Sequence, residues 1–310
     1  MLNKSIRILN LDDSLIRQQK LILQYKCEII DLSYLGPRVR LWMDKKTMKD
    51  IEGRIQGSLK NSITFLGSGD FHHISHILIN QFEQPLSLII FDFHPDWDTL
   101  PPHFGCGSWL TQTLKNKNIL KCILIGVSST DISSWWVESG NLDSLKDNKV
   151  EIYPYSHRPS LAFFKDVPAN ISLKIEKGFF YNKLYWNELK GKDLTGFFLS
   201  LLKRIPTEQV YISIDKDCLK KEYALTNWEE GHMSLEEFLL MLKLIKENLD
   251  IIGMDITGDY SKISLAGSYK RFFSRLDHPK NIDAEKFSAS FITATNEETN
   301  LKILELLASN

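Results

Sequence analysis

The chain has 310 residues, of which 43% are hydrophobic and 25% charged, a composition ordinary for a globular protein. This length suffices for one large α/β domain or two small ones. The net charge of -1 gives no electrostatic reason to expect nucleic acid or an anionic membrane as a partner. No apolar run approaches the roughly 20 residues that cross a bilayer, and residues 1–12 lack the apolar core of a signal peptide. Four cysteines without a C-x-x-C pair are typical of reduced thiols, so we expect a cytoplasmic protein.

Short apolar runs predict buried strands along the chain. In chain order these cover residues 26–31, 62–66, 86–92, 122–127, 150–153, 210–215 and 251–256. Helical patterns lie between many of them, over residues 45–58, 74–82, 109–117, 194–204, 235–248 and 296–308. Ser234 and Glu237 fit a capping box at the start of the 235–248 helix. The alternation of strands and helices predicts an α/β fold with a mostly parallel sheet covered on both faces.

The chain shows no internal repeat, linker or low-complexity segment, so we predict a single domain over residues 1–310. Residues 153–192 are the least regular part, and we interpret them as an irregular insertion. Five aromatic residues gather there: Phe179, Phe180, Tyr181, Tyr185 and Trp186. This cluster favours a packed insertion over a binding platform.

The segment from Phe91 to Asp98 carries the strongest chemical signal, and it follows an apolar run over residues 86–90. Asp92, His94 and Asp96 alternate in sequence, so on an extended backbone their side chains would point the same way. Burial of two carboxylates and an imidazole is unfavourable unless a cation or hydrogen bonds compensate. The segment therefore predicts a metal site at a strand end.

Two other predicted strands end in similar residues. Residues 63–66 lead into G-S-G-D-F-H-H, which contains His72 and His73, and residues 210–214 lead into Asp215 and Asp217. Because ligands of open parallel sheets bind at the carboxyl ends of strands, the three segments should meet in one crevice. Four carboxylates with imidazoles suit Mn²⁺ and related divalent ions. Two cations would remove the repulsion among the carboxylates and lower the pKa of a water molecule between them.

The three segments resemble motifs of the arginase and agmatinase (ureohydrolase) family in order and approximate spacing. G-S-G-D-F-H-H resembles G-G-D-H, D-F-H-P-D resembles D-A-H-x-D, and S-I-D-K-D resembles S-x-D-x-D. Residues 226–237 resemble the loop that leads into the next helix, since G-x-M-S-x-x-E is similar to G-G-L-T-x-R-E. The resemblance covers about residues 63–256 and implies a three-layer α/β/α sandwich.

The resemblance also implies two Mn²⁺ ions per chain, with Zn²⁺, Fe²⁺ or Co²⁺ as alternatives. Carried over residue by residue, the implied ligands are His72, Asp92, His94, Asp96, Asp215 and Asp217. Phe71 is an insertion relative to the family motif, so His73 remains an alternative to His72. Asp70 would orient a histidine ligand from outside the centre.

The chain departs from the family where the substrate should bind. Cys106 stands where the family has a substrate-facing histidine, although His103 is nearby. Gly258 occupies the position of the glutamate that binds a guanidinium, and Asp259 follows it. Asp98 lies just beyond the third ligand of its motif, so we expect it, with Cys106 and Asp259, to face the substrate. The resemblance therefore says more about the metal chemistry than about the substrate.

We predict a metal-dependent, ureohydrolase-like enzyme that hydrolyses a non-peptide C–N bond of a small guanidino, amidino or amide compound. Asp96 would accept a hydrogen bond from the attacking water, and His103 or His232 would carry a proton to the leaving nitrogen. Two alternatives are a zinc deacetylase-like amidohydrolase with one metal ion and a metal-binding pseudoenzyme without turnover. We expect neither nucleic acid nor a membrane as a partner, and we leave a homo-oligomer open.

Overall fold

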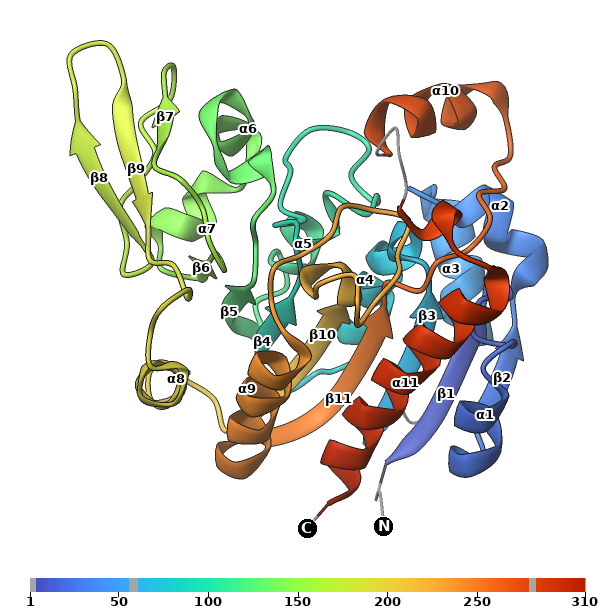
Figure 1. Ribbon diagram of the computed structural model, residues 1–310. Helices are drawn as coiled ribbons and strands as arrows, with labels where there is room; N and C mark the ends of the chain where they lie inside the picture. Colours follow the sequence, from blue (N-terminus) through green and yellow to red (C-terminus); the bar gives the residue numbers. More distant parts are fainter. Residues whose placement is uncertain (1–3, 56–60, 279–282, 310) are drawn as a thin grey trace.

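The computed structural model describes residues 4–55, 61–278 and 283–309 (Figure 1). An eight-stranded sheet runs through the described part of the chain, in the order β2-β1-β3-β11-β10-β4-β5-β6. Every neighbouring pair of its strands is parallel. The strands are β1 Ser5–Asn10, β2 Glu28–Asp31, β3 Ser62–Gly67, β4 Leu86–Phe91, β5 Ile119–Ile125, β6 Val150–Tyr153, β10 Gln209–Asp215 and β11 Asp250–Thr257.

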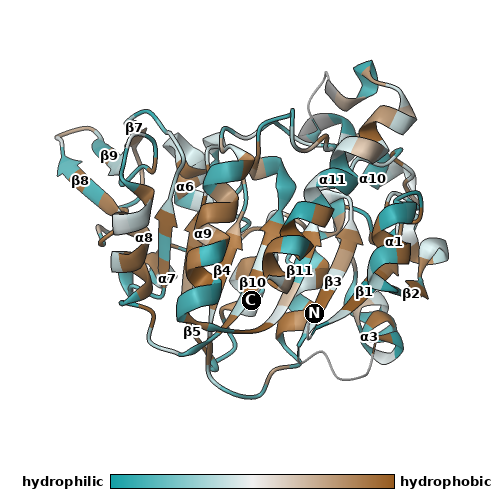
Figure 2. Cartoon of the chain, turned by 60° about the horizontal axis from the view of Figure 1, so that its bottom comes forward, coloured by the Kyte–Doolittle hydropathy of each residue, from teal (hydrophilic) through white to brown (hydrophobic). Residues whose placement is uncertain are grey.

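The central strands are apolar on both faces, which is why they read as continuous hydrophobic runs in the sequence. In β4, Leu88 and Ile90 belong to one hydrophobic cluster, whereas Ile89 and Phe91 belong to another. All four side chains are buried. The strands are accordingly mostly brown in Figure 2, and each face of the sheet needs a covering layer.

Helices supply both covering layers, as the shared hydrophobic clusters show. Leu21, Phe198, Phe238 and Ile303 place α1, α8, α9 and α11 on one face. Ile51, Ile77, Leu110 and Leu145 place α3, α4, α5 and α7 on the other. The helices are α1 Gln19–Tyr25, α2 Gly36–Val39, α3 Lys45–Arg54, α4 Ser75–Ile79, α5 Trp109–Thr113, α6 Ser134–Ser139, α7 Leu142–Lys146, α8 Leu194–Leu202, α9 Leu235–Asn248, α10 Ser268–Asp277 and α11 Ala289–Ala308. The predicted three-layer α/β/α sandwich with a parallel sheet is thus confirmed.

Local signals agree best with the structure at α9, whose bounds match the prediction. The capping box is present: the Ser234 side chain accepts from the Glu237 backbone N–H, and the Glu237 side chain accepts in return. Sequence patterns missed β1 and the helices α1, α2, α6, α7 and α10, and α11 begins well before residue 296. Within the described residues, no helix is both long and apolar enough to cross a membrane.

The segment predicted as irregular contains a small antiparallel sheet with the order β7-β9-β8. Its strands are β7 Ser160–Ala162, β8 Leu173–Lys177 and β9 Asn182–Trp186. Buried Glu138 fixes this sheet to α6, because its Oε1 accepts the backbone N–H groups of Phe163 and Phe164. The sheet stands at one edge of the molecule, beside α6 and β6 (Figure 1).

Candidate metal centre

Three strand ends bring the predicted ligands together. Strand β3 leads into a 3₁₀ helix, Gly69–Ile74, and β10 leads into another, Lys216–Cys218. Strand β4 lies beside β10 and leads into the loop that follows Phe91. Since all these strands are parallel, their carboxyl ends lie at the same edge of the sheet.

His72 lies against two carboxylates of the β4 loop. Its Nδ1 is 3.1 Å from Asp92 Oδ2 and 3.0 Å from Asp96 Oδ2, and it is 3.8 Å from Asp215 Oδ2. Donor atoms of His72, Asp92 and Asp96 all lie within 4.8 Å of one another. The three side chains are buried. They form a group that could hold one metal ion.

A second group shares Asp92 with the first. His94 Nδ1 is 3.0 Å from Asp217 Oδ2 and 3.8 Å from Asp92 Oδ1. The donor atoms of Asp92, His94 and Asp217 also lie within 4.8 Å of one another. Because Asp92 belongs to both groups, the two groups are adjacent and share one carboxylate.

The geometry behind this convergence differs from the prediction. Strand β4 ends at Phe91, and the backbone turns after it instead of continuing as an extended chain. Asp96 has a φ of 48°, in the left-handed region, so the predicted extended alternation is wrong. Backbone N–H groups orient the carboxylates: His94 N donates to Asp92 Oδ1 over 2.7 Å, and Phe93 N donates to Asp217 Oδ1 over 3.0 Å.

The structure groups His72, and not its neighbour His73, with the carboxylates. His73 is fully buried, and burial lowers its pKa to about 3, with the charge of Lys270 acting in the same direction. A neutral imidazole is therefore expected at His73. For His72, burial alone would lower the pKa, but contacts with Asp92 and Asp96 outweigh burial and hold it well above its ordinary value.

The carboxylates repel one another when no cation is present. Burial raises the pKa of Asp92 well above the usual range, and the charges of Asp96 and Asp217 raise it further. Burial and the charge of Asp217 raise the pKa of Asp215 to about 8. Asp92 Oδ2 is also buried without a well-aligned hydrogen bond, although His72 Nδ1 is close. A divalent cation would relieve both penalties, so the donor set fits one.

Partners outside the centre fix the ligand side chains. His72 Nε2 lies 2.8 Å from Ser213 Oγ, which donates to Asp255 Oδ1 over 2.7 Å. Trp109 Nε1 donates to Asp96 Oδ2 over 2.6 Å. His72 therefore presents Nδ1 to the centre and keeps Nε2 for a structural hydrogen bond.

Asp70 contacts a histidine, but it is not one of the candidate ligands. Its Oδ1 lies 2.8 Å from His278 Nε2, and its Oδ2 forms a close ion pair with Arg40 Nη1. Both partners are buried. The predicted role of Asp70 as an orienting group for a ligand is therefore wrong, since Ser213 holds that place at His72.

Four other predicted site residues belong to neither ligand group: His103, His232, Cys106 and Asp98. His103 and His232 are exposed, and the His232 ring is 6.2 Å from the Phe93 ring. Cys106 is half-buried, and its backbone N–H donates to Leu41 O. Asp98 is half-buried, and Ser139 Oγ donates to its Oδ1 over 2.9 Å. Burial raises the pKa of Asp98 to about 6, and the charges of Asp131 and Asp96 act in the same direction.

Asp259 forms a buried ion pair instead of facing the centre. Lys216 Nζ lies 2.9 Å from its Oδ2, and Gln18 Nε2 donates to its Oδ1 over 2.6 Å. Both carboxylate oxygens therefore have a partner, which leaves little capacity for a substrate. Lys216 stands between Asp215 and Asp217 in the sequence and is fully buried. Its ion pair with Asp259, 43 residues away, could not be predicted from local spacing.

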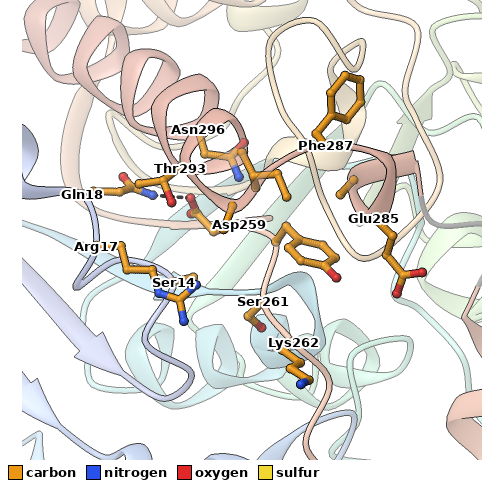
Figure 3. A pocket seen from close by; sticks show the side chains of 14 residues that line it. Ser14, Arg17, Gln18, Asp259, Ser261, Lys262, Glu285, Phe287, Thr293 and Asn296 are labelled. Carbon is orange, nitrogen blue, oxygen red and sulfur yellow. Dashed lines mark hydrogen bonds between the residues drawn. The ribbon is translucent and has the colours of Figure 1, made fainter.

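A cavity of about 390 Å³ has Asp259 among its lining residues and lies near the start of α11 (Figure 3). Arg17, Gln18, Lys262 and Phe287 are among its lining residues, and the dashed line in Figure 3 joins Gln18 to Asp259. None of the candidate metal ligands lines it. The cavity is thus separate from the metal centre.

Sequence patterns missed His278, which lies beside the centre. Its ring stacks on Trp228 with a centroid distance of 4.6 Å, and Trp228 in turn meets the His94 ring at 5.5 Å. No local pattern marks His278, because its partners Asp70 and Trp228 are distant in the sequence. Only the tertiary structure assigns it to this region.

Comparisons with known proteins agree with the architecture. No family model matches the chain. A Thermotoga maritima protein of uncharacterised function is 26% identical over 221 residues, which are 71% of this chain and 67% of that protein. Solved structures match at low identity but over nearly the whole chain. Arginase from Bacillus subtilis is 14% identical with a TM-score of 0.57, and 99% of each chain is covered.

Two further solved structures are, by name, an amidino hydrolase and a formimidoylglutamase. Proclavaminate amidino hydrolase from Streptomyces clavuligerus is 13% identical with a TM-score of 0.55, over 100% of this chain and 94% of that one. Formimidoylglutamase from Bacillus subtilis is 14% identical with a TM-score of 0.52, over 97% and 87%. Together with the parallel sheet and the helices on both faces, these matches show that the chain has the arginase (ureohydrolase) fold.

Proposed function

We propose that this protein is a metal-dependent hydrolase of a C–N bond in a guanidino, amidino or amide compound, with two Mn²⁺ ions per chain. The observation that supports this best is the pair of ligand groups that share Asp92. The structural neighbours include an arginase, an amidino hydrolase and a formimidoylglutamase, and their names are consistent with this class of chemistry. We also propose that the protein is located in the cytoplasm and that its substrate is a small molecule.

His72, Asp92 and Asp96 would hold one ion, and Asp92, His94 and Asp217 the other, with Asp215 close to the first. When bound, a pair of divalent ions activates water as a nucleophile and polarises a trigonal carbon. The protein's part is to hold the donors in fixed positions. Trp109 Nε1 orients Asp96 Oδ2, and we propose that the Asp96 carboxylate accepts a hydrogen bond from an attacking water molecule.

The surroundings of the centre favour a cationic or polar substrate. The carboxylates of Asp98, Asp131 and Glu229 all add negative charge at this end of the sheet, and Glu229 Oε2 lies 3.2 Å from His94 Nε2. Asp98 has one oxygen held by Ser139. We propose that its other oxygen binds the substrate or gives a proton to the leaving nitrogen, with His103 and His232 as alternative proton carriers.

Metal analysis of protein produced with Mn²⁺, together with a substrate panel, tests the proposal. We expect about two ions per chain, and release of ammonia or urea from at least one guanidino, amidino or amide compound. Asp92→Asn and Asp215→Asn should abolish turnover, whereas Asp166→Asn, at an exposed carboxylate far from the ligands in sequence, should not.

Fewer than one ion per chain, with Asp92→Asn and Asp215→Asn changing nothing, would refute the two-metal proposal. A single Zn²⁺ with amide hydrolysis would favour the deacetylase-like alternative. Tight binding of two ions without turnover of any C–N compound would favour a pseudoenzyme.

A further inference from the structure

The two ring nitrogens of His94 face different partners. Nδ1 faces Asp217 Oδ2 at 3.0 Å, inside the second ligand group, whereas Nε2 faces Glu229 Oε2 at 3.2 Å. An imidazole binds a metal ion through its unprotonated nitrogen, so the proton must then sit on the other one. Glu229 is therefore placed to accept the hydrogen bond of the Nε2–H group that a metal-binding His94 would carry.

The loop that carries Glu229 is anchored through Asn227. This side chain is fully buried, and its Oδ1 accepts from Ser68 Oγ over 2.9 Å and from Ser261 N over 3.0 Å. Its Nδ2 donates to Ser261 O over 2.8 Å. One side chain thus ties the loop to the segments that follow β3 and β11.

Trp228 fixes the next position of the same loop. Its indole stacks on His278 and meets the His94 ring edge-on at a centroid distance of 5.5 Å. A Cβ atom at Gly69 would lie 3.1 Å from Trp228 Cδ1, so the indole packs directly on that glycine. Because Asn227 and Trp228 are both held, Glu229 reaches His94 from a rigid support.

We propose that Glu229 is a positioning residue that fixes the tautomer and ring orientation of His94, and thereby sets the affinity of the Asp92–His94–Asp217 position for a divalent ion. This inference rests on the proposed function in one respect: a divalent ion must bind at the Asp92–His94–Asp217 position. The His72 position has its own outer partner, Ser213. A change at Glu229 should therefore weaken one position and spare the other.

Calorimetric titration of the metal-free full-length protein with Mn²⁺ tests this, with electron paramagnetic resonance to count bound ions. We expect Glu229→Ala to weaken one of two binding steps by about 10–100-fold, the range found when such outer partners are removed, and to leave the other step unchanged. Glu229→Gln keeps an oxygen that can accept from Nε2–H, so it should recover part of the lost affinity. Glu230→Ala is the matched control, because Glu230 pairs with Lys221 at 3.5 Å.

Three results would overturn the inference: unchanged binding in Glu229→Ala, equal weakening of both steps with a lower melting temperature of the metal-free protein, or a wild type that binds fewer than two ions. Selective loss of one ion without turnover of any C–N compound would support the inference and refute the proposed function. Turnover in the wild type, combined with unchanged binding in Glu229→Ala, would refute the inference alone.

Discussion

Gly258 offers a direct test of how closely the chain packs behind the metal centre. Its φ is +90°, and a Cβ atom there would lie 2.5 Å from Asp215 Oδ1 and 2.6 Å from the backbone N of Lys216. Gly258→Ala therefore meets two penalties. A side chain at this φ is unfavourable by about 1–2 kcal/mol, and overlap with a backbone atom adds about 1–3 kcal/mol.

Gly191→Ala is the matched control. Gly191 has a φ of +79°, but a Cβ atom there would meet nothing within 4 Å. Both variants share the positive-φ penalty, and both gain about 0.4–1 kcal/mol from the stiffer unfolded chain. The difference between them isolates the overlap, so Gly258→Ala should be less stable than Gly191→Ala by about 1–3 kcal/mol.

Denaturant unfolding of the metal-free proteins measures this difference, and titration with Mn²⁺ measures its consequence. We expect Gly258→Ala to bind Mn²⁺ more weakly as well, because the nearest atom to the new methyl group belongs to Asp215. Equal unfolding free energies for the two variants would show that the backbone at Gly258 relaxes freely, and that the packing argument is wrong.

Three further predictions concern the charges of the centre. Mn²⁺ at 100 times its dissociation constant should raise the unfolding free energy by about 2.7 kcal/mol per independent site, measured by thermal unfolding with and without the ion. Asp92→Asn should abolish that increase in unfolding free energy. Without metal, this variant should be at least as stable as the wild type, because Asp96 and Asp217 no longer repel a charge at position 92. A lower stability of the metal-free variant would contradict this reasoning. Burial lowers the pKa of His278, but the charge of Asp70 outweighs burial and raises the pKa above 6.5. The His278–Asp70 ion pair therefore stabilises the folded state fully below pH 6.5, and this stabilisation disappears as the pH rises through the raised pKa. The pH dependence of unfolding should lose this component in His278→Gln and keep it in His157→Gln, a control at a histidine without this carboxylate partner.

Structural elements whose residues have partners nearby in the sequence could be predicted from the sequence alone. The capping box of α9 joins Ser234 to Glu237 within one helical turn, and spacing alone identifies it. The apolar runs of β3, β4, β10 and β11 were equally clear, because strands buried on both faces need hydrophobic side chains at every position. Strand β1 was missed, since it contains Arg7, whose side chain is satisfied by Glu28 on the neighbouring strand.

The ligand residues were predictable as residue types, but their geometry was not. Asp96 reaches the centre through a left-handed backbone conformation, and not by extended alternation. Glu229 meets His94 from 135 residues away, and Asp70 meets His278 from 208 residues away. Such pairs depend on which strand ends become neighbours, which is a property of the sheet order rather than of local spacing.

Gly258 and the Lys216–Asp259 pair pack against one another. A Cβ atom at Gly258 would lie 3.0 Å from Lys216 Cβ, so the side chain of Lys216 passes through the space beside Gly258 on its way to Asp259. A larger residue at position 258 would have to displace the backbone of Lys216, between two candidate ligands. Since both carboxylate oxygens of Asp259 already have partners, we propose that negative charge for a cationic substrate comes from Asp98 and Glu229, in the loops that follow β4 and β10. A substrate panel should accordingly vary the group that those two carboxylates would meet, and keep the hydrolysed C–N group constant.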